Sequence, residues 1–234
     1  MQKTEKKVLL EYALKAYERA IAIDPKSRFN YQMGLIYGQM GKQDLMIEKF
    51  LDELYTSPQN SILIQNQFSR FMVDDADLVF ANQLRKALLV RVQKDQDLFW
   101  NQMLSWFFVQ QKEYGKAFIQ EKAIYKRNPE SLDAILSLAY MAVDDKQQTD
   151  AISILEYVLE NTNDVSQQVA AHTLLMQLKI EEATPSEYAK IDADLNHLFQ
   201  KCETGRVEEY GTIEETFSRE VLQDITQWIK SLTF

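Results

Sequence analysis

Apolar residues recur at intervals of three and four along most of this chain, the spacing that places them on one face of an α-helix. Stretches with this spacing cover residues 5–24, 27–57, 60–94, 97–128, 131–161 and 164–202. The first stretch has the length of one helix, and each of the others has room for two helices joined by a short turn. The pattern therefore predicts an all-α chain in which one unpaired helix precedes five helix pairs.

Prolines mark the ends of several of these stretches. Pro25, Pro58 and Pro129 each follow an amphipathic segment, and they are separated by 33 and 71 residues. A helix does not continue through a proline, because the residue lacks a backbone N–H and its ring clashes with the preceding turn. Since the second separation is close to twice the first, the prolines indicate an internal repeat.

The same order of residue types recurs around each proline. Small residues, aromatic residues and a final proline follow one another in Ala13, Tyr17, Ala20 and Pro25, then in Gly34, Tyr37, Gly41, Phe50 and Pro58, then in Tyr114, Ala117 and Pro129, and partly in Leu138, Ala139, Ala151 and Leu155. This order resembles the tetratricopeptide repeat, a helix–turn–helix unit of about 34 residues. The resemblance is close over residues 8–58 and good over 96–160. Over 59–95 only length and amphipathicity match.

The resemblance implies a right-handed α-solenoid built from about five and a half helix pairs over residues 1–202. In such a unit a small residue such as Gly34 or Ala139 lets two helices approach closely, and Tyr17, Tyr37 and Phe50 fill the space between neighbouring pairs. Because the chain begins directly in a second helix with Leu9, Tyr12, Leu14 and Tyr17 on its apolar face, we expect it to be part of a longer repeat protein.

The last part of the chain departs from the repeat. Thr184 to Glu187 reads as a capping box at the start of a helix, and residues 203–211 read as a loop. Beyond the loop an apolar stripe marks a final amphipathic helix, formed by Phe217, Val221, Ile225, Trp228 and Leu232. We expect residues 203–234 to be this loop and a capping helix, which covers Tyr188, Leu195 and Phe199 of the helix 186–202. The alternatives are that it folds into the groove of the array or pairs with a second molecule.

Composition and charge limit the partners. The net charge is −9 and residues 181–234 carry most of it, so no part of the chain has the cationic field that nucleic acid or an anionic membrane requires. The longest nearly apolar run, 134–143, is about half of the ~20 residues needed to span a membrane. We therefore expect a soluble protein that binds no nucleic acid and does not insert into membranes. Its compartment stays open: cytoplasmic by default, or periplasmic if a leader has been removed.

Candidate chemistry is sparse. Cys202 is the single cysteine, so an internal disulfide and a cysteine-based zinc site are excluded. His172 and His197 fall on different predicted helices without acids at ligand spacing. Asp74, Asp75 and Asp77, like Asp144 and Asp145, fall at predicted turns and are interpreted as helix caps, because their spacing does not fit an aspartate-rich metal motif. We expect no catalytic residue, cofactor or metal, and hence no enzyme.

Two further clusters have more than one interpretation. Aromatic residues are densest at Phe99, Trp100, Trp106, Phe107, Phe108 and Tyr114. We interpret them as packing between repeats, with an apolar hot spot for a partner as the alternative. The basic run Arg85, Lys86, Arg91 and Lys94 is interpreted as a solvated helix face, with a patch for an acidic ligand as the alternative.

The resemblance also implies a function. In this family the first helix of each pair lines a concave groove that receives a peptide or a helix. The matching positions here are Arg28, Tyr31, Leu35, Gln39, Phe99, Gln102, Trp106, Asp133 and Tyr140. The hypothesis is a non-catalytic scaffold that binds a protein or peptide of unknown identity, with self-association through terminal helices also open. The alternative is a structural segment of a longer repeat protein whose function lies elsewhere.

Overall fold

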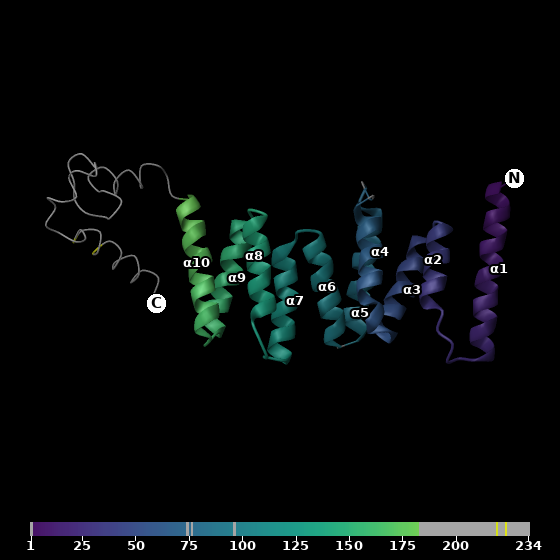
Figure 1. The fold of residues 1–234 in the computed structure, drawn as a ribbon, viewed down its shortest axis with the longest axis horizontal. Helices are drawn as coiled ribbons and strands as arrows, with labels where there is room; N and C mark the ends of the chain where they lie inside the picture. The colour runs from purple at the N-terminus through teal and green to yellow at the C-terminus, as the bar shows by residue number, and fades with distance from the viewer. Residues whose placement is uncertain are drawn as a thin grey trace, which may run out of the picture. The chain divides into compact units, whose positions relative to one another are not determined.

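The computed structural model describes residues 2–73, 75, 77–95, 97–182, 219 and 223. Over residues 2–182 of this described part the elements are ten α-helices and one short 3-10 turn, drawn in order in Figure 1. Their bounds are α1 (Gln2–Ile23), α2 (Asn30–Gln39), α3 (Gln43–Thr56), η1 (Pro58–Asn60), α4 (Ser61–Val73), α5 (Val79–Lys94), α6 (Leu98–Gln110), α7 (Tyr114–Arg127), α8 (Asp133–Asp144), α9 (Gln148–Asn161) and α10 (Val165–Glu182). The all-α prediction is confirmed, with most helix boundaries within a few residues of those expected.

The helices pack mainly against their neighbours in sequence. The closest partners are α2 with α3, α6 with α7 and α8 with α9, and each pair lies side by side in Figure 1. Helices α4 and α5 contact each other far less, and α5 instead packs more against α3 and α6. The stretch 60–94 thus contains the two expected helices without forming a close pair. Sequential packing of this kind is consistent with a helical repeat.

Three of the turns inside the pairs share one backbone geometry. Each contains one residue in the left-handed region, Gly41 (φ 73°), Lys112 (φ 56°) or Lys146 (φ 59°). The next residue donates its N–H to a carbonyl five residues earlier, over 2.9 Å in the first two turns and 2.8 Å in the third. This is the Schellman ending of a helix, which satisfies carbonyls that the helix leaves free. The same motif at intervals of 71 and 34 residues shows that the three pairs are structural equivalents.

The turn between α4 and α5 is built differently. Its left-handed residue, Leu78 (φ 55°), lies directly before α5. The Asp75 carboxylate accepts hydrogen bonds from the backbone N–H groups of Val79 (2.9 Å) and Ala81 (2.8 Å). The capping interpretation is therefore confirmed for Asp75. An acidic side chain here stabilises the start of α5, because the first N–H groups of a helix have no partner inside it.

Small residues lie where the helices of a pair approach most closely. The repeat spacing makes Gly34, Ser105 and Ala139 equivalent, and all three are buried. A Cβ atom on Gly34 would lie 2.5 Å from Cε1 of Phe50, so the phenyl ring occupies the space that a side chain would need. Two of the three aromatic residues expected between neighbouring pairs are found there: the Tyr17 ring lies 4.8 Å from Phe29, and the Phe50 ring 5.8 Å from Phe68. The position expected for Tyr37 stays a prediction.

The apolar face of α1 is only partly covered. Leu14 is buried and Tyr17 half-buried toward α2, whereas Leu9 and Tyr12 are 68% and 65% exposed. By its contacts the chain separates into two compact units, Met1–Leu174 and Leu175–Phe234, and the packing above belongs to the first. The features predicted for residues 184–234 include the capping helix and its contacts. They lie outside the described residues, or they depend on residues that lie outside them. The boundary expected near residue 202 stays a prediction.

Candidate partner-binding surfaces

The nine residues predicted for a groove all fall on first helices of pairs or next to them. Arg28 precedes α2, the helices α2 and α6 hold three residues each, and α8 holds Asp133 and Tyr140. The spacing of 71 and 34 residues that relates the turns also relates two sets of three. One set is Arg28, Phe99 and Asp133, and the other is Leu35, Trp106 and Tyr140. The structure therefore places these residues at repeated positions.

The second set is accessible from solvent. Tyr140 is 44% exposed, and Leu35 and Trp106 are half-buried. Trp106 lies beside α4, with its ring 6.4 Å from that of Phe68. Gln39 and Gln102, also predicted for the groove, are exposed as well. An apolar or aromatic side chain with an accessible surface thus recurs at one position of three first helices.

The first set is engaged within the protein. The Arg28 guanidinium donates to the Thr56 carbonyl oxygen at the end of α3, over 2.8 Å. The Phe99 ring lies 5.8 Å from the ring of Tyr55 on α3, and Asp133 accepts a hydrogen bond from Nε2 of Gln167, over 2.7 Å. Hydrogen bonds from Ser131 and Gln167 lower the pKa of Asp133.

Tyr31 is also engaged within the protein, since its ring lies 5.8 Å from that of Phe50. Tyr31 and the first set therefore contribute contacts between helices, whatever else they bind.

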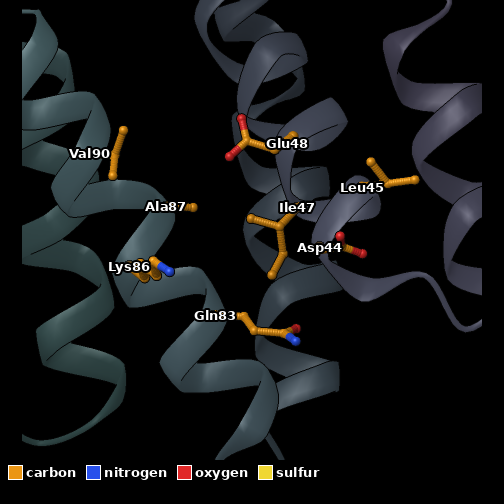
Figure 2. A pocket seen from close by; sticks show the side chains of 8 residues that line it. All are labelled: Asp44, Leu45, Ile47, Glu48, Gln83, Lys86, Ala87 and Val90. Carbon is orange, nitrogen blue, oxygen red and sulfur yellow. The ribbon is translucent and has the colours of Figure 1, made fainter.

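A hollow that the sequence pattern did not predict lies between the second helices α3 and α5. One part has a volume of about 460 Å³ and is lined on the α3 side by Asp44, Leu45, Ile47 and Glu48. The α5 side supplies Gln83, Lys86, Ala87 and Val90, and Figure 2 shows the Gln83 and Glu48 side chains reaching from opposite helices into the space between them.

A second hollow of about 330 Å³ shares Glu48 and Val90 with the first and continues to Tyr55, Asp95 and Trp100. We call the two together the α3/α5 furrow. None of the nine predicted residues lines it.

Arg91 joins the two walls of the furrow. Its guanidinium on α5 binds the carboxylates of Glu48 (2.6 Å) and Asp52 (2.7 Å) on α3. The same guanidinium lies 5.3 Å from the centre of the Trp100 ring on α6, within the range of a cation–π contact. Trp100 in turn stacks on Tyr55 of α3 at 5.3 Å. One arginine thus connects three helices of successive pairs.

The structure assigns most residues of the two clusters for which the sequence left alternatives. Trp100, Phe107, Phe108 and Tyr114 are buried, so the packing interpretation is confirmed for these four. The basic run is only partly a solvated face: Lys86 and Lys94 are exposed, whereas Arg91 is paired as above and Arg85 lies 5.7 Å from the Phe108 ring. For the two arginines the expectation was wrong, because both contact aromatic side chains that the sequence pattern did not place.

Polar contacts tie the turn after α6 to the turn after α8. The Asp145 carboxylate accepts hydrogen bonds from Nζ of Lys112 (2.7 Å) and from the hydroxyl of Tyr114. The Asp150 carboxylate accepts from the backbone N–H of Gly115, over 2.8 Å. Asp145 therefore joins two repeats and does not cap α9, which corrects its interpretation as a cap. Its bonds to Lys112 and Tyr114 lower its pKa, while burial and the bond to Asp145 raise the pKa of Tyr114 to about 12.

The described part of the chain contains no cluster of three or more histidine, cysteine or carboxylate side chains suited to a metal ion. His172 is exposed on α10, and His197 lies outside the described residues. In the same part of the chain, no helix combines the length and apolar character needed to cross a membrane.

No protein-family model matches the sequence, and a search of curated proteins found no match either. The family resemblance accordingly rests on the repeated residues of the sequence, and the repeated turns of the structure are consistent with a helical repeat.

Proposed function

We propose that this chain is a right-handed α-solenoid of tetratricopeptide type that acts as a non-catalytic scaffold and binds a peptide or helix of a partner protein. The observation that carries the proposal is the recurrence of Leu35, Trp106 and Tyr140 at one position of α2, α6 and α8. Each is accessible, whereas the residue before it, Gly34, Ser105 or Ala139, is buried. Helices α2, α6 and α8 thus each turn a small residue inward and an apolar one outward at this repeated position.

Stacked repeats that are each slightly rotated generate an extended concave surface, and an accessible row of this kind along it suits a partner that contacts several repeats at once. Tryptophan and tyrosine are the side chains that most often dominate binding energy at protein interfaces. The neighbouring glutamines, Gln39 and Gln102, add hydrogen-bonding groups without net charge. We therefore expect an amphipathic partner segment, with apolar side chains against the row and polar ones toward the glutamines.

A peptide library displayed on phage tests the proposal, because it samples partner segments of many sequences at once. Selected peptides should protect amides of α2, α6 and α8 from hydrogen exchange. Tyr140→Ala and Trp106→Ala should each weaken binding by about tenfold or more while the circular dichroism spectrum stays unchanged. Ile119→Ala, at an exposed site on a second helix, is the matched control and should bind normally. Protection confined to other helices, or failure to select any peptide, would refute the proposal.

A further inference from the structure

The α3/α5 furrow has walls of opposite charge. Acidic residues follow one another at intervals of four on α3, where Asp44, Glu48 and Asp52 form a stripe. On α5 the residues at the same interval are Lys86, Val90 and Lys94. Arg91 binds Glu48 and Asp52, which leaves the α3 wall with an excess of negative charge. Among the described residues, Lys86 and Lys94 form no ion pair, so they make the α5 wall positive, and Asp95 offsets part of this charge only at the Lys94 end.

The floor of the furrow is apolar. Val90 is 38% exposed between the two lysines, Ala87 is half-buried, and Tyr55 offers an exposed ring at the far end. Ile47 of α3 also lines the first hollow and is buried. Figure 2 shows Val90 and Ala87 on α5 facing the space beside Glu48 and Ile47. An occupant would therefore bury apolar side chains in the middle and meet opposite charges at its two edges.

The dimensions correspond to a short helix. From Asp44 to Tyr55, helix α3 rises about 16 Å, or three helical turns. Both walls are helices whose backbone groups are bonded within them, so the furrow has no strand edge on which an extended peptide could add hydrogen bonds. A helix lying along the furrow repeats its side chains at the same interval of three and four residues as the two walls.

The fold also fixes the spacing of the two walls of the furrow. Arg91 fixes the distance between α3 and α5 through two carboxylates and is itself positioned over Trp100. A preformed site of this kind avoids part of the entropy that is lost when a flexible surface becomes ordered on binding.

We propose that the α3/α5 furrow is a docking site for one amphipathic α-helix of a partner protein, with basic residues along the edge that faces α3 and acidic residues along the edge that faces α5. Charge complementarity selects this occupant: a helix basic on both edges meets Lys86 and Lys94, and a helix acidic on both edges meets Asp44 and Glu48. The site is separate from the row formed by Leu35, Trp106 and Tyr140, so the chain has two independent binding surfaces.

Three synthetic helices of about five turns serve as probes. They share a seam of leucines at intervals of three and four, and their edges are Lys/Glu, Lys/Lys or Glu/Glu. Fluorescence anisotropy should show that the Lys/Glu peptide binds the full chain about tenfold more tightly than either of the others at low salt, with the preference decreasing as salt is added.

Charge reversal of one wall supplies the decisive variant. Lys86→Glu combined with Lys94→Glu makes both walls acidic, so the preference should change to the Lys/Lys peptide. Lys26→Glu combined with Lys126→Glu is the matched control, since it reverses two exposed lysines outside the furrow.

Val90→Asp should weaken binding of the Lys/Glu peptide about tenfold, and Val79→Asp, on an exposed part of the same helix, should not. Trp106→Ala should leave binding unchanged, which separates this site from the proposed groove. Equal binding of all three peptides, binding of none, or an unchanged preference after charge reversal would overturn the proposal.

Discussion

Gly34 is the residue at which the packing of a helix pair tolerates least change. Its missing side chain is replaced by the edge of Phe50, which is 1% exposed. We predict that Gly34→Leu lowers the free energy of unfolding by about 1–3 kcal/mol, because overpacking forces the phenyl ring or the helix to shift. Urea denaturation measures the loss. Gln32→Leu, exposed on the same helix, is the control, and equal stability of the two variants would contradict the predicted register.

The equivalent pair of positions in α8 and α9 suggests a rescue. There Ala139 and Leu155 replace Gly34 and Phe50, and both are fully buried. Gly34→Ala and Phe50→Leu should therefore each destabilise the protein alone, while the double variant recovers part of the loss. A double-mutant cycle measures this coupling, which for residues in contact lies at about 0.5–3 kcal/mol. Strict additivity would show that the two positions do not share one packing site.

At this scale the sequence predicted the packing role of Gly34 and Ala139 well, because a small residue at a repeated helix position is typical of close helix approach. It predicted charged residues less well. Arg91 binds carboxylates that lie 39 or more residues away in the sequence, and Asp145 binds groups that lie 31 to 33 residues away. The spacing of residues along the chain does not reveal such distant partners. The α3/α5 furrow was missed for the same reason, since its walls are two second helices that are not neighbours in sequence.

At the scale of elements, the shared turn gives a reciprocal test. Gly41 adopts its positive φ without steric cost and has open space around the position of a Cβ atom. Lys146 adopts the same conformation with a side chain, which costs roughly 1–2 kcal/mol. We predict that Gly41→Ala destabilises the protein by about 1 kcal/mol, whereas Lys146→Gly stabilises it by about 0.5–1 kcal/mol after the greater freedom of glycine in the unfolded chain is counted. Thermal denaturation checks both signs, and a change in the same direction for both variants would exclude a common turn.

The contact between the turns after α6 and α8 makes the stability of the protein depend on pH in the alkaline range. The pKa of Tyr114 is about 12 in the folded protein, above the value near 10 of a free tyrosine. A group whose pKa is raised by folding contributes stability that is complete below its unfolded pKa and is lost as pH rises through the folded one. We predict that Tyr114→Phe is less stable than the wild type at neutral pH and that this difference shrinks between pH 10 and 12. The stability of Tyr12→Phe, changed at an exposed site, should vary with pH in the same way as that of the wild type. A difference in stability between Tyr114→Phe and the wild type that stays constant with pH would contradict the raised pKa of Tyr114.

The helix pattern predicted the elements of the described chain because the amphipathic spacing is long and is interrupted by prolines. It did not predict that α4 and α5 separate from each other. In the described part of their turn, the Asp75 carboxylate caps the start of α5. Helix–turn–helix spacing alone does not report how closely two helices approach, since this depends on small residues at the interface.

At the scale of the whole molecule, contacts between neighbours decide how unfolding spreads. When each unit touches only those beside it, stability is approximately a sum of local terms and of interfaces, and a weak link can isolate one part from another. Here the weakly attached element is α4, which contacts α3 and α5 less than the helices of the other pairs contact each other. The connection past it runs from α3 to α5 through Arg91.

We therefore predict that the pair α2 and α3, once destabilised, unfolds while the pair α8 and α9 stays folded. Gly34→Leu should increase hydrogen exchange of amides in α2 and α3 and leave α8 and α9 as protected as in the wild type, which mass spectrometry resolves by peptide. Adding Arg91→Met should increase this separation, because α3 then loses its polar connection to α5 and its share of the contact with Trp100. Ala139→Leu is the mirror experiment, and it should expose α8 and α9 first. If either substitution raised exchange equally in all pairs, the described repeats would unfold as one cooperative unit and the weak attachment of α4 would have no energetic effect.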